Sequence, residues 1–128
     1  MTTTARDLLA TLQDAVARKD ATALGTLFDD EAVLFGTAAA NLDRAASVAY
    51  LAQVVGQPET VRWEWDQVVP LWESADVLAF AAVGTVGFDD AQGRPDGPRE
   101  DFRLTCLAVS TDDGWRLRHF HGSVPATG

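Results

Sequence analysis

Basic residues and cysteine are scarce in this chain of 128 residues, and each shortage excludes a class of protein. The 10 lysines and arginines stand against 19 acidic residues, which leaves a formal net charge of −9. Such a chain repels phosphate backbones and anionic membrane surfaces, so we expect no nucleic acid and no membrane among its partners. The single cysteine, Cys106, cannot form an intrachain disulfide, which favours a reducing compartment.

Long apolar runs are also missing. The longest uncharged apolar stretch, residues 77–88, has 12 residues and is too short to span a bilayer. Arg6 and Asp7 fall where a signal peptide would begin its apolar segment, so we expect a cytoplasmic protein. Nine arginines to one lysine, with many alanines, favour a bacterial source. The length and the 47% hydrophobic content predict one domain over residues 1–128, with a structured core over 5–125.

The hydrophobic period divides the chain into a helical half and a sheet half. Apolar residues recur every three or four positions up to about residue 58, whereas from Thr60 onward they alternate with polar residues. The predicted elements are a helix over residues 4–18 with a cap at Thr4, a short helix after Asp20, a strand over 32–37, a helix after Asn41 or Asp43, and strands over 60–73, 76–88, 100–111 and 114–124. The chain is therefore α+β, with three helices before four long antiparallel strands.

Two segments of the sheet half have unusual turn chemistry. Residues 89–99 hold two glycines and two prolines and predict a mobile hairpin loop. Pro70 interrupts the first long strand and predicts a break or a bulge there. Turn signals at residues 74–76 and 112–114 predict the other two hairpins.

Three motifs carry a resemblance to known families. LFDDEAVLFGT at residues 27–37 resembles the passage from the second helix to the first strand in SnoaL-like proteins, and GWRLRHFHGSVP at 114–125 resembles their last strand. The latter segment and DAQGRP at 90–95 are also similar to the association domain of calcium/calmodulin-dependent protein kinases. The resemblance covers residues 5–125 and implies the nuclear transport factor 2-like, or cystatin-like, fold. In that fold a curved antiparallel sheet wraps as a cone around three N-terminal helices and encloses a cavity.

The resemblance does not imply one activity, because this fold includes isomerases, epoxide hydrolases, polyketide cyclases, dehydratases, oligomerisation domains and transport adaptors. The place of the isomerase base falls near Gly36, where no carboxylate stands, so isomerase chemistry is not expected. Three cavity arginines of the kinase domain fall on Gly84, Arg103 and Gly122, which implies a roomier and more apolar cavity here. Asp101-x-Arg103 has the spacing of an epoxide hydrolase pair in reverse order.

Alternation along residues 100–111 separates a polar set from an apolar set. Asp101, Arg103 and Thr105 share one face, which we expect to line the cavity. Asp101 then acts as a general base or an orienting carboxylate, and Arg103 as an anchor for an anion or a carbonyl. The alternative is a cross-strand salt bridge at the cavity mouth.

The last strand has a similar division. Arg118, Phe120 and Gly122 are expected to face the cavity. The opposite set is expected on an outer face that forms a homodimer, and it comprises Trp115, Leu117, His119 and His121. Two histidines without a third ligand favour structural roles, so no metal is expected. The only tyrosine, Tyr50, directs its hydroxyl either into the cavity or to water.

These observations predict a cytoplasmic homodimer whose apolar cavity binds a small hydrophobic organic molecule, without a cofactor. One hypothesis is an enzyme that acts on a hydrophobic carbonyl or epoxide through Asp101 and Arg103. The other is a non-catalytic binding or oligomerisation module similar to the kinase association domain. The expected ligand-binding residues are Arg103, Thr105, Arg118, Phe120, Gly84, Gly122 and Tyr50.

Overall fold

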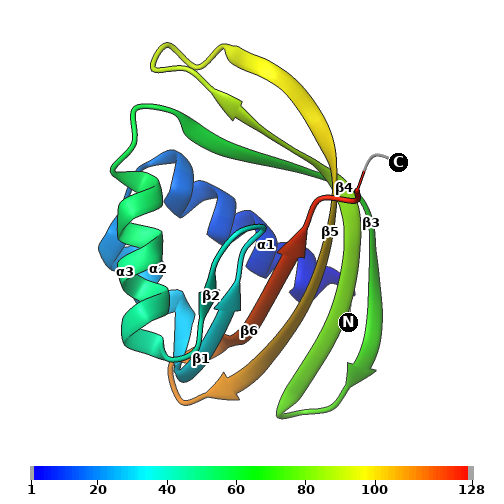
Figure 1. The fold of residues 1–128 in the computed structure, drawn as a ribbon. Coiled ribbons are helices and arrows are strands. Elements are labelled where there is room, and N and C mark those ends of the chain that lie inside the picture. Colours follow the sequence, from blue (N-terminus) through cyan, green and yellow to red (C-terminus); the bar gives the residue numbers. More distant parts are fainter. Residues whose placement is uncertain (1, 127–128) are drawn as a thin grey trace.

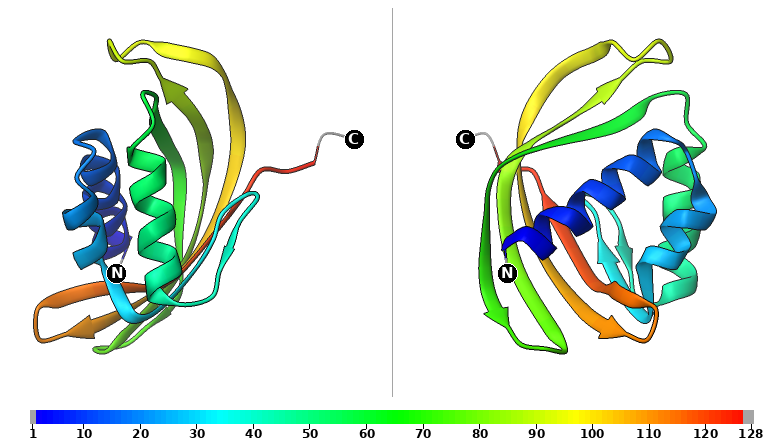
Figure 2. Two further views of the ribbon diagram at one scale, coloured as in Figure 1. Left: turned by 60° about the vertical axis from the view of Figure 1, so that its left-hand side comes forward. Right: turned by 180° about the vertical axis from the view of Figure 1, so that it is seen from behind.

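The computed structural model describes residues 2–126, so positions 1, 127 and 128 of the predicted domain lie outside the described residues. The elements are α1 (Thr2–Ala17), α2 (Ala21–Leu27), β1 (Phe28–Phe35), β2 (Ala40–Asn41), α3 (Arg44–Val55), β3 (Thr60–Glu73), β4 (Val77–Asp89), β5 (Pro95–Thr111) and β6 (Gly114–Ser123). One curved sheet has the strand order β2-β1-β6-β5-β4-β3 (Figure 1). All three helices lie on its concave side (Figure 2), which confirms the predicted α+β architecture.

Side-chain caps and an apolar stripe explain the helices. Asp20 accepts a hydrogen bond from the Ala23 amide at 3.0 Å, so the predicted cap of α2 forms. Asp43 accepts one from the Ala46 amide at 2.8 Å, so of the two alternatives for α3 Asp43 is the cap and Asn41 is not. The helix α1 begins two residues before Thr4, so the cap predicted there is wrong. The buried side of α1, which includes Leu8, Leu9 and Leu12, packs against the buried side chains of the sheet in one hydrophobic core. In the described part of the chain, no helix is both long and apolar enough to cross a bilayer.

The strand pairing adds several features that the sequence pattern did not predict. β3, β4, β5 and β6 form the expected antiparallel series, but β6 also pairs with β1 in parallel. β1 begins at Phe28, ahead of the predicted start, and the short strand β2 covers its outer edge. The expected irregularity at Pro70 is present as a register shift, and a second shift occurs between Trp65 and Gln67.

The segment predicted as a mobile loop is mostly a paired hairpin, with a register shift between Val86 and Phe88. β4 continues to Asp89 and β5 begins at Pro95, so the turn is short. The Asp90 carboxylate closes it by accepting hydrogen bonds from the amides of Gln92 and Arg94 at 2.9 and 3.0 Å. The prolines are tolerated because β5 pairs with β6 only from Arg103 onward, which leaves one side of its first residues without a neighbouring strand.

A bulge in β6 changes which side chains face outward. Leu117 pairs with Ala108, but the next pair along joins His119 to Leu107, so Arg118 is an extra residue. Leu117 is fully buried, whereas the two histidines lie on the convex face. The prediction that Trp115 and Leu117 share the outer face is therefore wrong, because the bulge reverses the alternation between them and His119.

Candidate ligand-binding cavity

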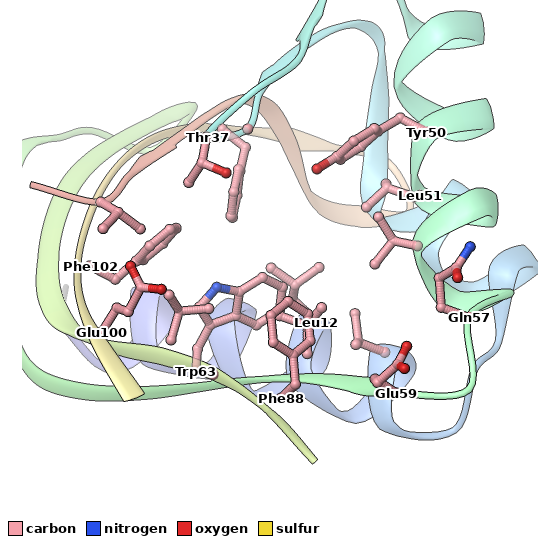
Figure 3. Close-up of a pocket in the computed structure, with 18 of the residues that line it drawn as sticks. Leu12, Thr37, Tyr50, Leu51, Gln57, Glu59, Trp63, Phe88, Glu100 and Phe102 are labelled. Atoms are coloured by element: carbon pink, nitrogen blue, oxygen red, sulfur yellow. The ribbon is translucent and has the colours of Figure 1, made fainter. Parts of the chain in front are cut away.

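A cavity of about 610 Å³ lies between the concave face of the sheet and the helices (Figure 3). Its volume suits a small organic molecule. The apolar part of the lining comprises Leu12, Val16, Phe28, Leu34, Leu51, Val54, Val61, Trp63, Val86, Phe88, Phe102, Phe120 and Val124. Phe88 is half exposed, so the cavity opens to solvent near the end of β4. The few polar side chains of the lining then decide what chemistry the cavity can recognise.

Trp63 forms part of the wall and is held in place from α1. It lies on β3, which is an edge strand, so its main-chain groups have no strand partner on one side. The Gln13 side chain occupies that side, donating to the Val61 carbonyl at 2.9 Å and accepting from the Trp63 amide at 2.7 Å. The indole Nε1 of Trp63 is buried without a hydrogen-bond partner. An unpaired buried donor costs about 1–3 kcal/mol, so an acceptor atom brought to it would be stabilising.

Tyr50 supplies a second donor from the opposite wall. It lies on α3, and its hydroxyl faces the cavity in Figure 3. Gly36, just after β1, makes room for it, because a Cβ at that position would lie 2.8 Å from the Tyr50 oxygen. Within residues 2–126, the Tyr50 hydroxyl has no hydrogen-bond partner. The space beside Gly36 therefore holds a phenol hydroxyl from a different element.

An ion-pair cluster on the convex side fixes the strands behind the cavity mouth. The Asp89 carboxylate binds Arg62 Nε and Arg99 Nη2, both at 2.9 Å. Burial alone would raise the pKa of Asp89, but the hydrogen bonds and charges of the two arginines outweigh it and lower that pKa below its usual value. The three residues alternate with Val61, Trp63, Phe88 and Glu100 of the lining. The cluster therefore sets the spacing of β3, β4 and β5 where they line the cavity.

The polar set of β5 lies on the wrong side to line this cavity. Asp101, Arg103 and Thr105 are exposed on the convex face, whereas Phe102 and the following alternate residues are buried on the concave face. The alternation was predicted, but the apolar set fills the concave face because the helices cover it. The assignment of Asp101 and Arg103 as cavity groups, and of Thr105 as a ligand contact, is therefore wrong.

Three other residues that were expected to contact the ligand are instead ion-paired or closely packed within the protein. Arg118, the bulge residue, forms ion pairs with Asp29 at 2.9 Å and Glu31 at 3.2 Å, so it does not line the cavity. Gly84 and Gly122 are buried, but a Cβ on the first would collide with the main chain of β3 and one on the second with the Phe102 ring. Neighbouring groups thus already fill both places.

Two expected residues do line the cavity, and several lining residues were missed. Tyr50 and Phe120 contribute to the wall. Trp63 was interpreted as core or interface, although its alternation with charged residues was the available signal. Glu59 and Glu100 carried no signal of their own: Glu59 lies in the connection from α3 to β3, and the position of Glu100 depends on the extended β4–β5 hairpin.

The two histidines lie on the convex face of the sheet, whereas Cys106 is buried on the concave side. His119 Nδ1 lies 2.9 Å from the Val33 carbonyl oxygen, and both imidazole rings contact Phe35 edge to face. Among the residues that the structure describes, no three metal-ligating side chains come together. Burial raises the pKa of the Cys106 thiol, which leaves it unreactive.

Comparisons with known proteins identify the family but no activity. No curated protein matches the sequence significantly. A candidate calcium/calmodulin-dependent protein kinase II association domain from Xanthomonas campestris has a TM-score of 0.80 and 17% identity, covering 97% of this chain and 87% of that chain. A candidate dehydratase of the NTF2-like family from Streptomyces avermitilis has a TM-score of 0.77 and 16% identity, covering 94% and 92%. A nuclear transport factor 2-like superfamily protein from Salmonella enterica has a TM-score of 0.77 and 13% identity, covering 98% and 92%.

At these identities the solved structures show the shared fold alone. They agree with the resemblance seen in residues 27–37 and 114–125, since they include both an association-domain structure and NTF2-like proteins. The SnoaL-like domain matches residues 5–127, which is nearly the whole chain. The chain therefore belongs to the SnoaL-like domain family.

Proposed function

We propose that this SnoaL-like domain binds a small, mainly apolar organic molecule that carries a hydrogen-bond acceptor such as a carbonyl oxygen. The observation that carries the proposal is the Tyr50 hydroxyl, which faces an apolar cavity of about 610 Å³ without a partner among residues 2–126. The buried and unpaired Nε1 of Trp63 supports it, since the same ligand can satisfy a second donor.

Binding is better supported than catalysis. The pair proposed from the sequence for chemistry on a carbonyl or an epoxide, Asp101 and Arg103, lies outside the cavity. A candidate dehydratase shares this fold, but at 16% identity the likeness assigns no catalytic role to any residue of this chain. The buried and unpaired Cys106 supports a reducing, cytoplasmic setting.

The neutral fluorescent probe N-phenyl-1-naphthylamine tests the binding function. Its emission rises when it enters an apolar site, so the protein should give a saturable increase that fits one site per chain. Val54→Trp places a large side chain in the cavity from α3 and should abolish the increase. Ala52→Trp on the exposed side of the same helix is the control and should bind normally. Equal binding by the two variants, or no saturation, contradicts the proposal.

A second proposal, homodimer formation, rests on the convex face of the sheet. Trp72, Val69 and Val83 lie there with 65%, 48% and 46% of their surfaces exposed. Monomeric proteins seldom expose large contiguous apolar patches, and a second copy would cover this one symmetrically. Light scattering should show a dimer at tens of micromolar, and Val83→Glu should convert it to a monomer. A wild-type monomer at that concentration contradicts the proposal.

A further inference from the structure

The charged groups that line the cavity all have the same sign. They are Glu59, which precedes β3, together with Asp96 and Glu100 of β5. Among the residues that the structure describes, no lysine, arginine or histidine is part of the lining. Glu59 and Glu100 approach the cavity from different sides in Figure 3, with Trp63 and Phe88 between them. The rim of an apolar cavity thus holds three carboxylates.

These carboxylates lack the ion-pair partners that acids elsewhere in the protein have. Asp89 has two arginines and Asp29 has Arg118, whereas no cation forms an ion pair with Glu59, Asp96 or Glu100 in the described chain. The only lysine, Lys19, is near the first of them but donates to main-chain oxygens, those of Gln57 at 2.7 Å and Glu59 at 2.9 Å. Three like charges therefore repel one another around one opening, in a protein of net charge −9.

We propose that the ligand is a cationic amphiphile: an aromatic or aliphatic body that fills the cavity and presents its acceptor to the Tyr50 hydroxyl, with a protonated amine that rests among Glu59, Asp96 and Glu100. The inference rests on the proposed function, because it specifies the ligand class of the same cavity. The apolar body contacts Trp63 and Phe102, and the ammonium group replaces the missing ion-pair partners. A ligand carboxylate in the same position would add a fourth negative charge and is disfavoured.

The expected selectivity is moderate, because the rim is open to water. Glu100 and Asp96 are exposed and Glu59 is half-buried, so solvent and salt screen each charge. The rim attracts an ammonium group and repels a carboxylate, and both effects increase the difference in affinity between the two ligands. We expect the ammonium ligand to bind about tenfold more tightly than the carboxylate, a difference of about 1.4 kcal/mol.

Three naphthalene compounds with one skeleton measure this selectivity. Naphthalen-2-ylmethylamine is cationic at pH 7, naphthalen-2-ylmethanol is neutral, and 2-naphthoate is anionic. Titration calorimetry on the wild-type protein should give the order amine, alcohol, carboxylate, with the spread reduced in about 0.5 M salt. Glu59→Gln combined with Glu100→Gln should reduce the amine-to-carboxylate ratio to below about threefold. Glu64→Gln combined with Asp66→Asn, an equal charge change at two exposed sites outside the lining, is the control and should keep the ratio.

The outcomes separate this inference from the proposed function. If the alcohol binds but the amine has no advantage over the carboxylate, the ligand class is wrong and the binding cavity stands. If the Glu64 and Asp66 variant reduces the ratio as much as the Glu59 and Glu100 variant, selectivity comes from net charge and the rim carboxylates are not the cause. If none of the three compounds binds, the proposed function fails together with the inference.

Discussion

Replacing Asp89 by asparagine should destabilise the protein in a pH-dependent way. The Asp89 side chain is 6% exposed and binds two guanidinium groups at 2.9 Å. Removing one member of a buried ion pair costs about 3–5 kcal/mol when its partner stays buried. Here the arginine side chains are 39% and 26% exposed, so water compensates part of the loss. Asparagine also keeps one acceptor oxygen, and we therefore expect Asp89→Asn to lower the free energy of unfolding by about 2 kcal/mol at pH 7.

The pH dependence distinguishes a charge effect from a packing effect. The pKa of Asp89 is lowered in the folded protein, so its ionised form stabilises the fold fully above the unfolded value of about 3.9. That contribution is lost as the pH falls through the lower folded pKa. The difference in free energy of unfolding between wild type and Asp89→Asn should thus be largest at pH 7 and shrink below about pH 4.

Urea unfolding followed by tryptophan fluorescence from pH 7 to pH 3 measures this difference. Asp101→Asn is the control, since its carboxylate is exposed on the convex face, and it should change the free energy of unfolding by less than about 0.5 kcal/mol. A difference for Asp89→Asn that stays constant across this pH range, or that is no larger than the control at pH 7, would refute the reasoning.

Three further predictions concern the cavity and the core. Phe102 is buried, so Phe102→Ala should lower the free energy of unfolding by about 3 kcal/mol, whereas Arg103→Ala at an exposed position should change it by less than about 0.5 kcal/mol. Urea unfolding measures both, and a larger loss for Arg103→Ala would mean that the other face of β5 points inward. Tyr50→Phe should weaken the binding of 2-acetylnaphthalene by about fivefold in calorimetry, equivalent to about 1 kcal/mol for one hydrogen bond, and leave naphthalene binding unchanged; equal losses for both ligands would assign the tyrosine a packing role. The Cys106 thiol should react with a thiol reagent only after unfolding, because it is buried and its pKa is raised; rapid labelling of the native protein would contradict this.

Local patterns were sufficient to predict most of the fold. Asp20 and Asp43 cap their helices as their positions indicated, because an N-cap interaction needs only residues three positions apart. The change of hydrophobic period at Thr60 likewise marks the start of β3. The β4–β5 hairpin was harder to predict, since its prolines are compatible with a strand only where one side of β5 has no partner.

The site was less predictable, because strand alternation separates two faces without saying which of them the helices cover. On β5 the resemblance to the kinase domain favoured Arg103 inside, yet the helices cover the side of Phe102. On β6 a single extra residue at Arg118 changes the face between Leu117 and His119. Bulges depend on pairing between distant strands, which period and composition do not report.

A crystal structure with bound 2-acetylnaphthalene tests the central claim most directly, namely that this cavity is the binding site. We expect the ring system between Trp63 and Phe102, with the carbonyl oxygen about 3 Å from the Tyr50 hydroxyl. At a saturating concentration, an empty cavity, or a ligand bound only on the convex face beside Arg103, would contradict the account.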